Sequence, residues 1–171
     1  VGLFAISEVM INVEQRITAI SEFDITNWMP TWADIKQCIG TMLRASGIGF
    51  FLGLLPGCAP SVVSFVAYDV EKRVSKHPER FGKGAIQGVC APETSNNATS
   101  TAGFVPLFSF GLPTAPSMAV MLGGLMMYGL QPGPMLFAQN PQFVWAVIAS
   151  MYIGNVMLLI LNLPLVGMWA K

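Results

Sequence analysis

Residues 94–170 contain no charged side chain and no histidine. Soluble domains carry charge on about 25% of their residues. This chain of 171 residues carries charge on 11% and is 53% hydrophobic. Such a long uncharged stretch cannot cover the surface of a soluble domain, because that surface is dominated by charged and polar side chains. We therefore predict an all-α integral membrane protein, in which lipid surrounds the apolar residues.

The charges and the cysteines argue against several functions. Nine Lys and Arg balance nine Asp and Glu, so the net charge predicts no nucleic-acid partner. Three cysteines, at positions 38, 58 and 90, lie far apart without a CxxC spacing, which indicates neither a disulfide framework nor a zinc site. We interpret them as packing residues and expect no metal site.

The last apolar stretch has the length of a membrane-spanning helix. The candidate helix begins at Gln142, and tryptophans lie towards both of its ends, at Trp145 and Trp169. About 20 apolar residues cross the hydrocarbon core, and aromatic side chains favour its boundaries. We therefore predict a transmembrane helix over residues 142–169.

Two other apolar stretches are interrupted by proline. Residues 39–68 are predicted to form a broken helix or a hairpin, because Pro56-Gly57 cannot continue a regular helix. Residues 84–134 are broken in the same way at Pro113. Non-helical backbone at membrane depth is tolerated only inside protein or beside a water-filled cavity. The breaks indicate discontinuous or re-entrant segments of a polytopic protein, and the alternative is that both are packing kinks.

The two breaks resemble each other in sequence, with LPGCAPS at residues 55–61 and LPTAPS at residues 112–117. A helix can restart after each last proline, since proline is tolerated in a first turn and Ser or Thr can cap it. Such a helix start carries free N–H groups, and paired broken segments mark transporter sites for anionic groups. The candidate binding residues at the breaks are Gly57, Ser61, Thr114 and Ser117.

Residues 69–83 form a predicted basic loop. They carry five Lys or Arg against three acids, and the positive-inside rule places them in the cytoplasm. The polar connecting segment at residues 8–38 has the opposite balance. It faces the other side of the membrane only if residues 45–68 cross fully. The sequence leaves open whether they cross or turn back at the proline.

A dense run of hydroxyl and amide side chains occupies residues 92–103. Burying so many polar groups in a bilayer is costly unless a partner satisfies them. Their oxygens can coordinate a cation such as Na⁺, and their N–H and O–H groups can donate to a carboxylate. The candidate residues for solute and cation are Asn96, Asn97, Thr99 and Ser100. The alternative is a polar turn outside the bilayer.

Glu93 is the sole acid after residue 83. It is a candidate for an ion or proton role, and its alternative is a structural role at the membrane interface.

Several short motifs together are similar to those of one known family. They are FGKG at 81–84, GV at 88–89, PE at 92–93, NNA at 96–98, PL at 106–107, GLP at 111–113 and GLQPGP at 129–134, and the opening GLFAISE at 2–8 also fits. The chain resembles the large membrane subunit of the tripartite tricarboxylate transporters, the TctA type. Those subunits are longer, so the resemblance implies that residues 1–171 are a fragment of one membrane domain.

The resemblance implies a multi-pass secondary transporter of the bacterial inner membrane that takes up carboxylates such as citrate. An ion gradient drives it, and no cofactor is expected beyond a coupling cation, Na⁺ or H⁺. The implied partners are a small membrane subunit, a periplasmic solute-binding protein, the carboxylate solute and the lipid bilayer. Thr114 and Ala59 depart from the family pattern, in which glycine is common at both places.

Two other functions compete with transport. An intramembrane enzyme could use a Ser or Thr nucleophile, but residues 94–170 offer no His, Lys, Asp or Glu to activate a hydroxyl. We therefore predict no catalytic residues. A structural or assembly subunit would tolerate changes of the polar residues in the breaks without loss of uptake.

Overall fold

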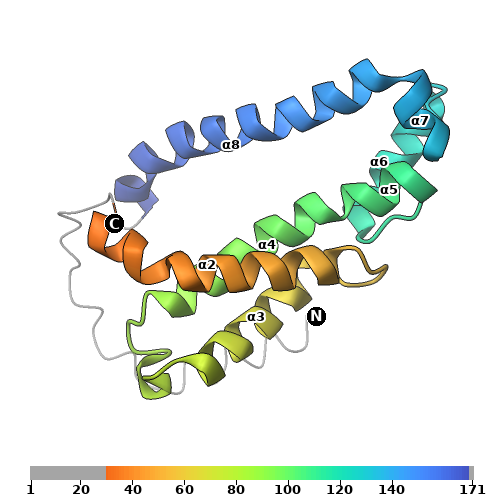
Figure 1. Ribbon diagram of the computed structural model, residues 1–171. Coiled ribbons are helices and arrows are strands. Elements are labelled where there is room, and N and C mark those ends of the chain that lie inside the picture. The colour runs from red at the N-terminus through yellow and green to blue at the C-terminus, as the bar shows by residue number, and fades with distance from the viewer. Residues whose placement is uncertain (1–29, 170–171) are drawn as a thin grey trace, which may run out of the picture. The chain divides into compact units, whose positions relative to one another are not determined.

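The computed structural model describes residues 30–169, with side chains up to residue 165. This part of the chain is all-helical and has no β-strand, which confirms the helical class predicted from the sequence. The elements are α2 (Trp32–Gly53), α3 (Pro60–Val74), a 3₁₀ turn η1 (Pro78–Arg80), α4 (Gln87–Ala102), α5 (Phe104–Phe110), α6 (Pro116–Met127), α7 (Pro134–Gln139) and α8 (Pro141–Trp169) (Figure 1).

The chain divides into two units. One comprises residues 30–161, and the other takes in the rest of the chain. All contacts described below lie within the first unit. The opening motif and most of the predicted polar segment 8–38 lie outside the described residues.

Helix α2 begins at a capping box. The hydroxyl of Thr31 accepts from the backbone N–H of Asp34 at 3.3 Å, and the Asp34 carboxylate accepts from the backbone N–H of Thr31 at 2.9 Å. This reciprocal pair satisfies backbone donors that a helix start leaves free. Hydrogen bonds from the Thr31 hydroxyl and then from its backbone lower the pKa of the Asp34 carboxyl.

The first predicted break is a tight turn. Helix α2 ends at Gly53, Gly57 adopts a left-handed φ of 87°, and α3 restarts with Pro60 in its first turn. Beyond the turn the two helices run antiparallel, because residues 41 and 44 of α2 contact residue 71 of α3. The chain therefore turns back here, which is one of the two alternatives left open by the sequence.

Helix α4 packs against small residues of both α2 and α3. A Cβ on Gly49 would lie 2.5 Å from the Ser95 carbonyl oxygen, and one on Gly53 would lie 2.8 Å from the backbone of Thr99. From Gly49 to Gly53 the chain moves four residues along α2, and the contacted residue moves four along α4, from Ser95 to Thr99, so the two helices run parallel. Alanines 45, 67 and 91, one from each helix, are buried together. Only small side chains allow helix backbones to approach this closely.

The predicted basic loop is shorter than expected. Residues 69–74 form the last turns of α3, and the connection to α4 contains the 3₁₀ turn η1. The helix continues because no proline or glycine interrupts it before Pro78. Glu71 therefore lies on the buried face of a helix and not in a solvated loop.

The second break separates α5 from α6. Helix α5 ends at Phe110 and is followed by Gly111, whose φ of 68° is left-handed, and α6 begins at Pro116. The N-cap residues of α3 and α6 are Ala59 and Ala115, and neither makes a side-chain cap bond. The Ser and Thr of both breaks therefore do not cap these helices, contrary to expectation.

A hydrophobic core joins the helices α5, α6 and α7, on both sides of the second break, to the start of α8. Phe108 makes tilted ring contacts with Phe104 and Phe143, at centroid distances of 5.4 and 6.0 Å. The backbone N–H of Gly133 donates to the Phe108 carbonyl at 2.8 Å. The buried members of the core are Leu107, Phe108, Met118, Leu125, Leu136 and Val144.

Among the described residues, α8 is the one helix long and apolar enough to cross a membrane. Its candidate span covers Pro141–Leu165, 25 residues. At a rise of 1.5 Å per residue this span reaches about 37 Å, against about 30 Å for a hydrocarbon core. Most of its side chains are exposed, as expected for contact with lipid or with further helices.

Candidate solute-binding site

Residues from the polar run and from the second break meet at one small pocket. The pocket has a volume of about 160 Å³. Its polar lining comes from Thr99 and Ser100 at the end of α4, and from Thr114 and Ser117 at the start of α6. The apolar lining residues are Pro60, Phe104, Ala115, Met118 and Met121. The fold thus brings together four of the predicted binding residues from two separate segments.

The start of α6 leaves a backbone donor at this pocket. The N–H groups of Met118 and Ala119 both donate to the Ala115 carbonyl, at 3.0 and 3.1 Å. The N–H of Ser117 makes no hydrogen bond within the described part of the chain, as expected in the first turn of a helix. Donors at such a position favour anionic groups.

Thr114 is held against the end of α4. Its side chain is buried, and its hydroxyl lies 3.3 Å from the sulfur of Met118. A Cβ on Gly103 would lie 2.5 Å from the Thr114 hydroxyl oxygen. Glycine at position 103 therefore allows the break before α6 to approach α4 and close this side of the pocket.

The two α4 residues of the pocket differ in what their hydroxyls do. The Thr99 hydroxyl is buried and contacts the carbonyls of Ser95 at 2.7 Å and Gly49 at 3.1 Å. Thr99 thus joins α4 to α2, and its hydroxyl is already engaged. The Ser100 hydroxyl is half-buried and has no hydrogen-bond partner among the described residues. Ser100 and Ser117 are the available hydroxyl groups.

The remaining predicted residues do not line this pocket. The amide of Asn96 faces α3 and donates to the Ser64 hydroxyl at 3.4 Å. Asn97 is exposed and borders a separate groove of about 530 Å³, together with Ser46 and Thr94. Gly57 and Ser61 are exposed at the turn between α2 and α3 and line none of these cavities.

Glu93 lies at a third cavity, away from the hydroxyl pocket. It is exposed and borders a space of about 300 Å³ together with Asp34, Cys38 and Cys90. Burial, and then the neighbouring Cys90, raise the pKa of the Cys38 thiol to about 11, so this thiol stays protonated. No group of three or more His, Cys, Asp or Glu within residues 30–165 could hold a metal ion.

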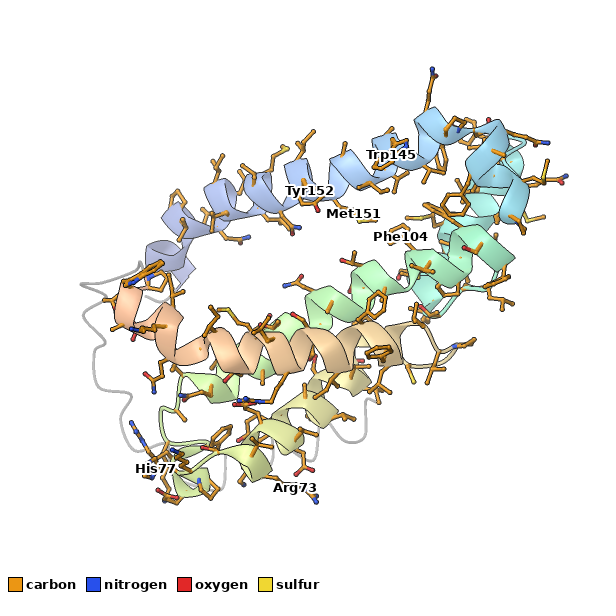
Figure 2. All side chains as sticks on the ribbon, viewed as in Figure 1. Arg73, His77, Phe104, Trp145, Met151 and Tyr152 are labelled. Atoms are coloured by element: carbon orange, nitrogen blue, oxygen red, sulfur yellow. The ribbon has the colours of Figure 1, made fainter. Side chains whose placement is uncertain are left out.

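A larger apolar cavity of about 370 Å³ lies between α4, α5 and α8. Phe104, Met151 and Tyr152 line it (Figure 2). Its polar lining is limited to residues such as Thr101 and Asn155. The cavity lacks the cluster of small hydroxyl residues that distinguishes the smaller pocket.

Sequence reasoning missed a buried ion pair. The Glu71 carboxylate accepts from the Thr41 hydroxyl at 2.7 Å and from Arg44 Nε and Nη2 at 3.0 and 2.7 Å. Burial alone would raise the pKa of Glu71, but the hydrogen bonds from Arg44 and Thr41 outweigh it and lower the pKa. The sequence feature that could have revealed it is the spacing of small and apolar residues. Val63, Ala67 and Glu71 recur every four residues and lie on the buried face of α3.

The amino-acid pattern over the whole chain decides the family. The profile described as "Tripartite tricarboxylate transporter TctA family" matches residues 1–171. The chain belongs to the TctA family. This confirms the resemblance drawn from the short motifs, and it places the chain in a family of transporters. No solved structure matches this TctA-family chain.

The chain is also similar to two proteins from Agrobacterium vitis. The chain is 41% identical over 174 residues to an "Uncharacterized 52.8 kDa protein in TAR-I ttuC' 3'region", covering 100% of this chain and 34% of the relative. It is 48% identical over 123 residues to an "Uncharacterized protein in TAR-II ttuC' 3'region", covering 72% of this chain and 51% of the relative. The chain therefore spans a third to a half of the length of these relatives.

Proposed function

We propose that this chain is part of the large permease subunit of a tripartite system for carboxylate uptake. The system works by secondary active transport across the bacterial inner membrane, driven by a gradient of Na⁺ or H⁺. Its solutes are tricarboxylates and similar acids. Its partners are a small membrane subunit and a periplasmic solute-binding protein, and transport needs only differential binding in two alternating states.

The observation that carries the proposal is the pocket formed by Thr99, Ser100, Thr114 and Ser117. Its volume of about 160 Å³ is below the roughly 300–1,000 Å³ of a drug-sized ligand site, so it suits one carboxylate group or a small acid. Hydroxyl donors and the free N–H at the start of α6 can bind a carboxylate. No charged side chain lines the pocket, so the solute is not held by an ion pair and can be released.

The groove beside Asn97 is a second part of the proposed site. Asn97 borders this groove together with Ser46 and Thr94, and these three residues offer one amide and two hydroxyl oxygens on α2 and α4. Uncharged oxygen ligands of this kind suit a hard cation. We therefore assign the coupling cation to this groove and the solute carboxylate to the hydroxyl pocket.

Uptake by the complete permease tests the proposed function. The permease and its small subunit are reconstituted in proteoliposomes, and the binding protein is supplied outside with radiolabelled citrate. We expect accumulation when a Na⁺ or pH gradient is imposed and none when an ionophore collapses it. Chemical turnover of citrate in detergent, without any gradient, would instead indicate an enzyme.

A further inference from the structure

The end of α3 and its connection to α4 present unpaired positive charge at one end of the helical unit. Residues 69–83 form a basic segment there, and its five exposed cationic residues are Lys72, Arg73, Lys76, Arg80 and Lys83. Arg73 pairs with Asp69 at 2.8 Å, and Glu79 lies 3.3 Å from His77. Figure 2 labels Arg73 and His77 at this end.

Glu71, the third acidic residue of the basic segment, faces the interior and does not offset the positive charge of the exposed residues. Glu71 is buried and satisfied by Arg44 of α2. Four of the five basic residues consequently have no ion-pair partner in the part of the chain that the structure describes: Lys72, Lys76, Arg80 and Lys83. Lys72 and Arg73 in the last turn of α3 also interact favourably with the helix dipole, but residues 76, 80 and 83 lie beyond that helix.

The basic segment is held in a defined shape. Phe81 is buried, and its ring meets that of Tyr68 edge-on at a centroid distance of 5.6 Å. The Arg80 carbonyl accepts from the backbone N–H groups of Lys83 and Ala85, at 3.0 and 3.3 Å. Gly82, with a φ of 79°, permits this reversal. A preformed cationic surface binds its partner at a lower entropic cost.

Exposed apolar side chains accompany the same segment. Val74 lies within it, in the last turn of α3, and Ile86 and Val89 follow it at the start of α4. Their exposed fractions are 55%, 38% and 65%. Exposed apolar side chains beside unpaired cations are typical of surfaces at the boundary between a bilayer and water.

We propose that the basic segment binds the phosphate groups of anionic phospholipids. The proposal rests on the membrane location in the proposed function. Lysine ammonium and arginine guanidinium groups donate charge-assisted hydrogen bonds to phosphate oxygens, and clustered cations beside a membrane attract anionic lipid. A nucleic-acid partner fits poorly, because acidic residues balance the basic ones over the whole chain.

Lipid binding by the complete, detergent-purified permease tests this proposal. The permease is titrated with phosphatidylglycerol, and native mass spectrometry measures the bound lipid. Phosphatidylcholine serves as the matched neutral lipid. We expect preferential retention of phosphatidylglycerol. The triple variant K76Q/R80Q/K83Q should lose about fivefold in affinity per charge, on the order of 100-fold in all. Glu79→Gln removes an acid and should raise the affinity.

The same preparation supplies the controls. The three substituted side chains are exposed, so the triple variant should keep the elution volume and melting temperature of the parent. Equal retention of both lipids, or unchanged affinity in the triple variant, would overturn the proposal. Displacement of lipid by equimolar inorganic phosphate would assign the site to free phosphate and also overturn it. Gradient-driven uptake without lipid preference would leave the proposed function standing.

Discussion

Arg44 and Glu71 form a two-pronged ion pair between two antiparallel helices. Arg44 Nε lies 3.0 Å from Glu71 Oε2, and Arg44 Nη2 lies 2.7 Å from Oε1. The Glu71 side chain is 6% exposed and that of Arg44 is 44% exposed. The pair closes the α2–α3 hairpin far from its turn, so the turn and the pair together fix the register of the two helices.

Replacing Glu71 with Ala should destabilise the protein, because it leaves the buried Thr41 hydroxyl and the Arg44 guanidinium without their acceptor. Breaking a buried pair costs about 3–5 kcal/mol, and the partial exposure of Arg44 reduces this to about 1–3 kcal/mol. Thermal unfolding of the purified permease measures the effect. Asp69→Ala, which breaks an exposed ion pair on the same helix, should change stability by less than about 1 kcal/mol.

Replacing Gly49 with Ala should push α4 away from α2. The added Cβ would lie 2.5 Å from the Ser95 carbonyl oxygen and 2.8 Å from the Ala98 Cβ. Overpacking of this kind costs about 1–3 kcal/mol. Gly47→Ala on the same helix meets nothing within 4 Å, so helix propensity should leave it neutral or stabilising by up to about 1 kcal/mol. Equal melting temperatures of the two variants would contradict the close packing of α2 and α4.

The sequence predicted the helical class, the last helix and both breaks, because proline and a long apolar run act locally. It could not decide whether residues 45–68 cross or turn back. That choice depends on contacts across the hairpin, such as Arg44 with Glu71, which local patterns do not encode. The predicted loop over residues 69–83 was wrong for residues 69–74, which belong to α3. The run of charged residues suggested a loop, while the spacing of the buried residues of α3 favoured a helix.

The candidate site was predicted in part. An i, i+3, i+4 spacing puts Asn96, Thr99 and Ser100 on one face of a helix. In the structure Asn96 contacts α3, Thr99 contacts α2, and Ser100 borders the pocket. One helix face spans a wide arc, so neighbours on it can meet different partners, and only the packing of α2 and α3 separates them.

Replacing Asn97 with Ala should abolish uptake or weaken it sharply without affecting the fold. Its side chain is exposed at the groove and makes no hydrogen bond within the described residues. The substitution removes the amide oxygen that the proposed groove offers to the coupling cation, so gradient-driven uptake should fall. Expression and melting temperature should be unchanged. Normal uptake at normal protein level would remove Asn97 from the site.

A cysteine at Ser75 should be shielded from impermeant reagents in intact cells. Ser75 directly follows α3 beside the basic segment, whose charge predicts a cytoplasmic location. A maleimide that cannot cross the membrane should label this cysteine only after the cells are opened. Labelling in intact cells would contradict the proposed orientation. A cysteine at a periplasmic position, which should be labelled in intact cells, is the positive control.

The most direct test compares Ser117→Leu with Ser150→Leu in gradient-driven uptake of radiolabelled citrate. Ser117 lies at the hydroxyl pocket in the first turn of α6, whereas Ser150 is exposed on α8 and donates to the Val147 carbonyl at 2.7 Å. A bulky leucine at Ser117 should raise the apparent KM or block uptake, and the same change at Ser150 should have a small effect. Equal and mild losses in both variants would contradict a solute site at this pocket and make the second break a packing kink.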